Sequence, residues 1–147
     1  MLKSKTVRVF RHSYFSDSPT ANSSLEADKK QLYEDFKLYI QSGKHLSESP
    51  FQQFGRDELY DHMNTPSPVK LAALRHVHIV PVKRVGKFQR KYDTKSDVHL
   101  VYCIDSLTGH VCAIALIEPA HDLAKDAAFL TNLAEAAEEF YSQASSL

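Results

Sequence analysis

The chain of 147 residues carries 18 Lys and Arg against 18 Asp and Glu, and 43% of its residues are hydrophobic. This composition is that of one soluble globular domain, so we expect residues 1–147 to form a single domain, and it excludes a disordered tail or a fibre. The longest apolar run, Val111 to Ile117, is too short to span a bilayer, and the N-terminus has no signal-peptide pattern. We therefore expect a cytoplasmic protein without a membrane partner.

The net charge of zero argues against a nucleic-acid partner when it is taken as a sum. The order of the charges along the chain is compatible with such a partner, because the two signs are segregated. Residues 70–95 hold eight basic side chains and one acid, whereas residues 97–147 hold eight acids and one base. An anion-binding surface needs such segregation, although a solvated loop would have the same pattern.

The first part of the chain predicts a strand and a helix. Residues 5–10 alternate in polarity, which is typical of a short strand at a sheet edge. Residues 11–23 are predicted to be a polar loop insertion. Ser23 and Glu26 then form a capping box, and apolar residues recur at helical spacing until Gly43, which predicts one amphipathic helix.

The segment Phe54-Gly-Arg-Asp-Glu-Leu-Tyr-Asp61 is predicted to be a short helical turn that begins after Gly55. Pro66 and Pro68 are expected to end it. Its charged residues have a structural interpretation, in which Asp57 caps the helix or pairs with Arg56.

Three extended segments follow, at residues 74–82, 98–104 and 110–117. The turn-like residues between the last two predict an antiparallel hairpin. With the turn centred on Leu107 and Thr108, Cys103 would lie opposite Cys112. The two cysteines lack the spacing of a disulfide framework or a zinc knuckle, so both are expected to be reduced core residues.

Pro119 closes the third segment, and a final helix is expected from about Asp122. This order predicts an α+β fold: a mostly antiparallel four-stranded sheet with two N-terminal helices and a C-terminal helix, all on one side of the sheet.

Histidine is frequent, with eight residues in the chain. His76 and His78 alternate on a predicted strand and leave the same face about 7 Å apart. His99 begins the next strand, and His121 lies just beyond the third. Near neutral pH, imidazoles can act as general acid and base, although buried structural histidines are a common alternative.

Cofactor motifs are missing from the sequence. It has no glycine-rich phosphate loop and no G-x-S-x-G elbow, so we expect no small-molecule cofactor and no acyl transfer. The His76/His78 pair could hold zinc, but no third ligand at a standard spacing is visible, and we therefore predict no metal.

A basic segment, residues 83–97, lies between the first two of the three strands. The aromatic residues Phe88 and Tyr92 are interleaved with its basic side chains. Cations can pair with phosphates and aromatic rings can stack on bases, so RNA binding is predicted. The expected RNA-binding residues are Lys83, Arg84, Lys87, Lys91 and Lys95, with Arg90 beside them. Histidines next to such a segment favour phosphodiester cleavage, in which a base deprotonates the 2'-hydroxyl and an acid protonates the leaving 5'-oxygen.

The chain resembles the YafO-like toxins of bacterial type II toxin-antitoxin modules over about residues 51–140. The resemblance rests on four ordered blocks, which are the segment 54–61, His76-Val-His-Ile79, the block 94–103 and the block 114–126. The family is distantly similar to the RelE-type toxins. The resemblance implies a RelE/ParE-like microbial RNase architecture, metal-independent cleavage of mRNA in the ribosomal A site, and a cognate antitoxin as inhibitor.

The same resemblance implies an active face built from three places. These are the first of the three predicted strands, the loop and strand after it, and the residues just beyond the third strand. The implied catalytic residues are His76, His78, Arg90, Asp97 and His121. His121 and His78 are assigned the acid and base roles in unspecified order. Arg90 and Lys91 would bind the phosphate, and Asp97 either orients a histidine or only caps the loop before its strand.

Two other functions remain open from the sequence. A non-catalytic module could use the same basic segment to bind RNA, the ribosome or an acidic protein. A zinc-dependent hydrolase could use His76 and His78, and would contain bound metal after purification.

Overall fold

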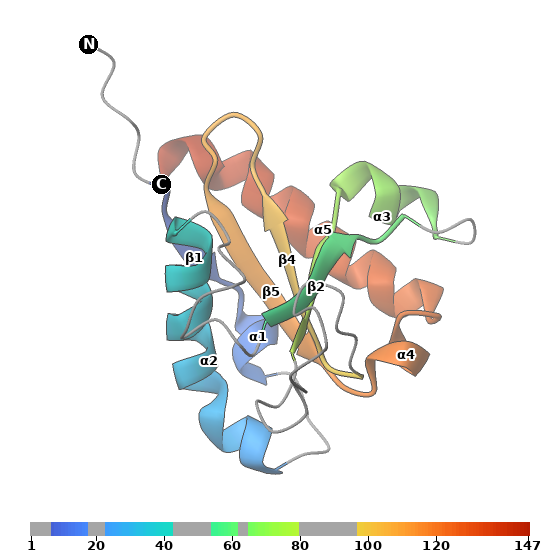
Figure 1. Cartoon of the computed structure of the whole chain (residues 1–147). Helices are drawn as coiled ribbons and strands as arrows, with labels where there is room; N and C mark the ends of the chain where they lie inside the picture. The colour runs from blue at the N-terminus through green and yellow to red at the C-terminus, as the bar shows by residue number, and fades with distance from the viewer. Residues whose placement is uncertain (1–6, 18–22, 43–53, 62–64, 80–96) are drawn as a thin grey trace.

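The computed structural model of the chain describes residues 7–17, 23–42, 54–61, 65–79 and 97–147. Five strands within these residues form one mixed sheet in the order β1-β5-β4-β3-β2. They are β1 (Val9–Arg11), β2 (Phe54–Leu59), β3 (Arg75–Ile79), β4 (His99–Ile104) and β5 (Val111–Ile117). Only β1 and β5 pair in parallel (Figure 1). The α+β class and the mostly antiparallel sheet are confirmed, but the predicted number of four strands is wrong.

The β4–β5 hairpin is confirmed, with Cys103 directly opposite Cys112 and both thiols buried and free. Its turn is held by Asp105, whose Oδ2 accepts hydrogen bonds from the backbone N–H and the hydroxyl of Thr108 at 2.9 and 2.7 Å. Gly109 follows with φ +76°, a backbone conformation that costs glycine little. The turn residues therefore set the pairing of the two strands.

The described helices are α1 (Ser13–Asp17), α2 (Ser23–Gln41), α3 (Ser67–Ala72), α4 (Ala120–Leu123) and α5 (Ala127–Gln143), with a final 3-10 turn (Ala144–Ser146). The predicted helix from Ser23 is confirmed as α2. The predicted loop of residues 11–23 contains α1. The expected final helix is two helices, because Asp126 begins a new one by accepting a hydrogen bond from the backbone N–H of Phe129.

Helices cover both faces of the sheet, and the prediction that they share one side is wrong (Figure 1). Phe36 and Tyr39 of α2 pack with Leu100 on one face, whereas Leu133 of α5 packs with Val101 on the other. All seven residues of β5 are buried. An unbroken apolar strand is typical of a sheet covered on both sides.

The segment 54–59 is the edge strand β2 rather than a helical turn. It pairs antiparallel with β3, where Glu58 lies opposite His76. Asp57 neither caps a helix nor pairs with Arg56, whose guanidinium contacts Glu58 at 3.0 Å. Pairing with β3 decides this structure, since the polar composition of the segment gives no strong local preference.

Pro66 and Pro68 begin a helix that was not predicted, α3, instead of ending one. Pro66 is the N-cap, and Pro68 lies in the first helical turn, where the missing N–H is no loss. This helix packs against α5, and Tyr141 donates a hydrogen bond to the carbonyl of Ala72 at 2.6 Å. The helices α3 and α5 together cover part of the sheet face on which the predicted histidines lie.

Candidate functional site

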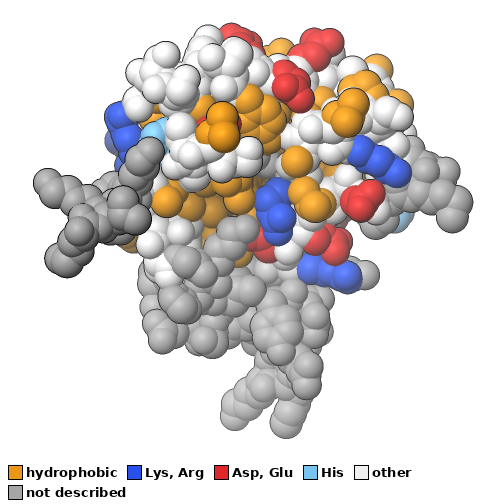
Figure 2. Space-filling model, turned by 90° about the horizontal axis from the view of Figure 1, so that it is seen from above, with side chains coloured by type: hydrophobic (Ala, Val, Ile, Leu, Met, Phe, Trp, Pro, Cys, Tyr) orange, Lys and Arg blue, Asp and Glu red, His pale blue; other side chains and the backbone are white. Residues whose placement is uncertain are grey.

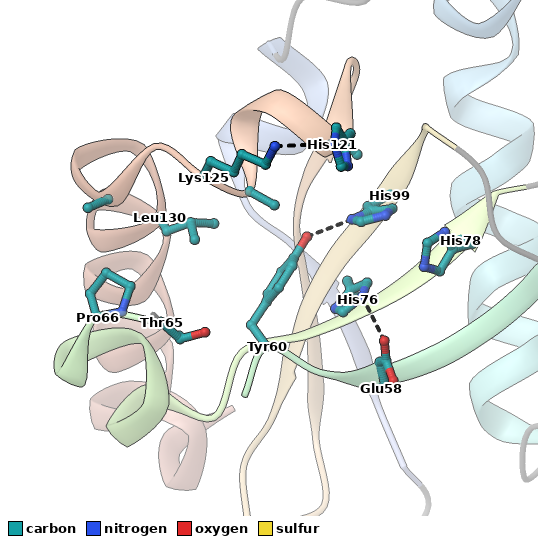
Figure 3. A pocket seen from close by; sticks show the side chains of 13 residues that line it. Glu58, Tyr60, Thr65, Pro66, His76, His78, His99, His121, Lys125 and Leu130 are labelled. Carbon is teal, nitrogen blue, oxygen red and sulfur yellow. Dashed lines mark hydrogen bonds and ion pairs between the residues drawn. The ribbon is translucent and has the colours of Figure 1, made fainter. Parts of the chain in front are cut away.

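A pocket of about 650 Å³ lies between the sheet and the helices α4 and α5. Its polar lining includes four imidazoles, a carboxylate, a phenol and an ammonium group, and Figure 3 shows how they face one another. These residues are Glu58, Tyr60, His76, His78, His99, His121 and Lys125. Apolar side chains such as Leu130 form the remaining wall.

Three of the imidazoles come from neighbouring strands. His76 and His78 share a face of β3, and His99 of β4 is the direct partner of His78. The ring centroid of His99 lies 4.5 Å from that of His76 and 4.2 Å from that of His78, and the rings of His76 and His78 are 5.4 Å apart. All three are at most 7% exposed. The pairing of β3 with β4 therefore makes one buried cluster of three histidines.

Strand β2 adds two groups to this cluster. Tyr60, directly after the strand, stacks on His76 with ring centroids 4.0 Å apart, and its hydroxyl lies 2.8 Å from Nδ1 of His99. Glu58 Oε1 lies 3.7 Å from Nε2 of His76. The Tyr60 hydroxyl and the Glu58 carboxylate each contact one nitrogen of an imidazole and so favour one tautomer of that ring.

Burial sets the protonation of His99 and Tyr60. Burial, and after it repulsion from His76 and His78, lowers the pKa of His99 to about 2, because the charged imidazole is poorly solvated there. Burial also raises the pKa of Tyr60 above its usual value of 10.0. At neutral pH, His99 is thus a neutral imidazole beside a protonated phenol.

His121 and Lys125 stand on the opposite side of the pocket and are exposed. Lys125 Nζ lies 3.2 Å from Nε2 of His121, one helical turn away (Figure 3). This places a cation next to an imidazole where solvent and a large substrate can reach both. The two sides of the pocket therefore differ: the histidine cluster is buried, whereas His121 and Lys125 are exposed.

Asp97 holds the start of α4. Its Oδ1 accepts a hydrogen bond from the backbone N–H of His121 at 2.7 Å, and its carbonyl oxygen accepts one from the N–H of Ala120 at 2.8 Å. The carboxylate thus contacts the backbone of His121. Its described contacts do not include the imidazole of that residue.

Of the predicted catalytic residues, His76, His78 and His121 line this one pocket, and Asp97 anchors the backbone beside it. Arg90 and the predicted RNA-binding residues lie outside the described residues: Lys83, Arg84, Lys87, Lys91 and Lys95. In the described part of the face seen in Figure 2, basic and acidic side chains are interspersed.

Four titratable residues of the pocket are not among the predicted site residues: Glu58, Tyr60, His99 and Lys125. His99 could have been found from the strand pairing, because the first residue of β4 must face the end of β3. Lys125 follows His121 at helical spacing. Glu58 and Tyr60 were not predicted, because a helical turn at their segment would not place them beside the strand of His76.

The buried histidines are also candidate metal ligands. One ligand nitrogen of each of His76, His78 and His99 lies within 4.8 Å of the other two. The alternative of a zinc site on His76 and His78 lacked a third ligand in the sequence, and His99 has the right chemistry and place for it.

No helix in the described part of the chain is long and apolar enough to cross a membrane.

A family model described as "Toxin YafO, type II toxin-antitoxin system" matches residues 37–142. That range includes every polar residue of the pocket named above. Comparison with curated proteins and with solved structures gave no match.

Proposed function

Since the chain belongs to the YafO family, and is thus the toxin of a type II toxin-antitoxin system, we propose that it is a ribosome-dependent endoribonuclease that cleaves mRNA. A type II toxin has a cognate antitoxin protein as its partner. The proposed reaction is metal-independent attack of a 2'-hydroxyl on the adjacent phosphodiester, within a fold of the RelE/ParE type.

One observation carries the proposal: His78 and His121 line the same pocket from opposite sides, with Lys125 next to His121. Cleavage of this kind needs a base at the 2'-hydroxyl, an acid at the leaving 5'-oxygen and a cation near the charge that develops on phosphorus. Two imidazoles and an ammonium group can supply all three roles.

The proposed roles follow the position of each group in the pocket. His121 and His78 act as acid and base in an order that we leave open, and His76 supports His78 from the same strand. Lys125 is an additional candidate for the developing charge. Asp97 acts as a positioning residue through the backbone of His121.

RNA binding is proposed for the basic segment that contains Arg90 and Lys91, which lies outside the described residues. The chain as a whole has no net charge. Because the affinity for free RNA depends on the release of counterions, a neutral protein is expected to bind naked RNA weakly. This supports targeting by the ribosome.

The test is cleavage of mRNA in a translating system with purified toxin, in a buffer whose zinc chelator leaves ribosomal Mg²⁺ in place. New RNA 5' ends are expected, and His121→Gln should reduce their yield by about 10²- to 10⁴-fold. His12→Gln is the matched control, because His12 contacts the backbone of Tyr14 and is not among the pocket residues.

An intact message at saturating toxin would overturn the proposal. Translation that slows without new RNA ends would favour the non-catalytic binding module instead.

A further inference from the structure

We propose that His76, His78 and His99 form a binding site for Zn²⁺, and that the bound ion holds the nuclease inactive. The binding part stands on the geometry of the cluster alone. The inhibitory part rests on the function proposed above.

The spacing of the cluster fits one ion. In a tetrahedral zinc site with Zn–N bonds of about 2.0–2.1 Å, two ligand nitrogens lie roughly 3.3 Å apart. The ligand nitrogens of the three histidines already lie within 4.8 Å of one another. Because adjacent strands hold the three backbones in register, side-chain rotation is the movement needed to close the remaining gap.

The groups around the cluster resemble the outer shell of a metal site. A ligating histidine usually gives its other ring N–H to an oxygen, which sets the tautomer and the ring orientation. The Tyr60 hydroxyl lies 2.8 Å from Nδ1 of His99, which leaves Nε2 to bind the ion. Glu58 is placed to do the same for His76, with its carboxylate 3.7 Å from Nε2.

The surroundings of the three rings also fit. A metal binds the lone pair of an imidazole, and the three rings lie together with at most 7% of each residue exposed. The carboxylate of Glu58 adds one negative charge near the ion. Three protein ligands on the wall of a pocket leave a fourth position for water.

Three imidazoles select the class of ion. Mg²⁺ and Ca²⁺ prefer oxygen ligands, whereas imidazole suits Zn²⁺, Cu²⁺ and Ni²⁺. Zn²⁺ is the member that tetrahedral nitrogen sites hold without redox chemistry, and it is the ion to test first.

Binding and catalysis compete for the same nitrogens. An imidazole whose lone pair binds zinc can neither take up nor deliver a proton at that atom. If His78 is one of the proposed acid–base pair, an occupied site blocks its role while His121 stays exposed. Zinc therefore acts as an inhibitor, and the metal-free protein is the active form.

The first experiment measures binding without any activity assay. Metal-stripped protein competes with a chromophoric chelator for Zn²⁺, and one ion per chain is expected. His99→Gln should weaken the affinity by about 100-fold or more, since it removes a ligand. His12→Gln, a histidine outside the pocket, should leave the affinity unchanged. Circular dichroism checks that both variants are folded.

Co²⁺ gives a second readout of the site. Four-coordinate Co²⁺ absorbs visible light far more strongly than the hydrated ion, so the wild-type protein should develop these bands and His99→Gln should not. No stoichiometric zinc binding, or equal affinity in folded wild-type and His99→Gln proteins, would overturn the site.

The second experiment tests inhibition. Stoichiometric Zn²⁺ should abolish mRNA cleavage by the wild-type toxin, and a zinc chelator should restore it. Zinc that binds but leaves cleavage unchanged would overturn the inhibitory role. Failure of the proposed function has a different signature, because the metal-free toxin would then cut no message while its zinc binding persists.

Discussion

Asp57 on β2 accepts hydrogen bonds from the hydroxyl of Tyr102 on β4 at 2.6 and 2.7 Å, across the intervening strand β3. Tyr39 of α2 donates a third hydrogen bond at 2.8 Å, and Arg75 of β3 lies 3.4 Å away. Alternation along β2 then places Glu58 on the opposite face, at the histidine cluster. One buried carboxylate thus aligns the edge strand that completes the pocket.

Replacement of Asp57 should destabilise the fold strongly. Its side chain is 6% exposed, and its loss leaves two tyrosine hydroxyls and a guanidinium without their shared acceptor. Asp57→Ala should lower the free energy of unfolding by about 3–5 kcal/mol, and Asp57→Asn by less, because the amide still accepts a hydrogen bond. Denaturant unfolding measures both.

Asp61→Asn is the matched control for Asp57. Asp61 is exposed, and its contact with Lys70 spans 3.8 Å, so the expected loss is below about 1 kcal/mol. Equal losses at the two positions would contradict the role of the Asp57 network.

Tyr60 contacts His76 through its ring and His99 through its hydroxyl. Two substitutions separate the effects of the ring and of the hydroxyl. Tyr60→Phe keeps the ring that stacks on His76 but removes the hydroxyl at His99. It should cost about 1 kcal/mol of stability and roughly tenfold in zinc affinity. Tyr60→Ala also removes a buried ring and should cost about 3–5 kcal/mol. If Tyr60→Phe left zinc affinity at the wild-type value, the hydroxyl would not orient His99.

Asp97 is expected to act on catalysis through the position of His121. Asp97→Ala removes the acceptor of the His121 N–H and should lower kcat by about 10- to 100-fold, with a smaller change in KM. Asp97→Asn should restore most of the activity, since its Oδ1 still accepts that hydrogen bond. A uniform loss in both variants would indicate that the negative charge matters instead.

The thiols of Cys103 and Cys112 should be inert in the native protein. Burial raises the pKa of Cys112 to about 12 and that of Cys103 above its usual value of 9.0, so little thiolate exists at pH 8. Iodoacetamide should therefore modify both cysteines slowly, and denaturant should accelerate the reaction by orders of magnitude. Mass spectrometry follows the reaction, and rapid native labelling would contradict the burial.

Local signals in the sequence were sufficient for the elements whose contacts are local. The capping box at Ser23 predicted α2, and the turn residues from Asp105 to Gly109 predicted the β4–β5 hairpin and its register. The period of a strand placed His76 and His78 on one face. In each case the pattern that made the prediction lies within a few residues along the chain.

Tertiary contacts decided the rest. The segment of Glu58 is a strand because β3 offers it hydrogen-bonding partners, and Pro66 begins a helix because α5 gives that helix an apolar surface to cover. His99 joins His76 and His78 through strand pairing, over more than twenty residues of chain. Composition and periodicity alone do not specify such pairings, since the burial that stabilises them exists only after distant segments have met. The sequence by itself determined which chemistry the chain carries, and the tertiary structure decided which of its histidines share a pocket.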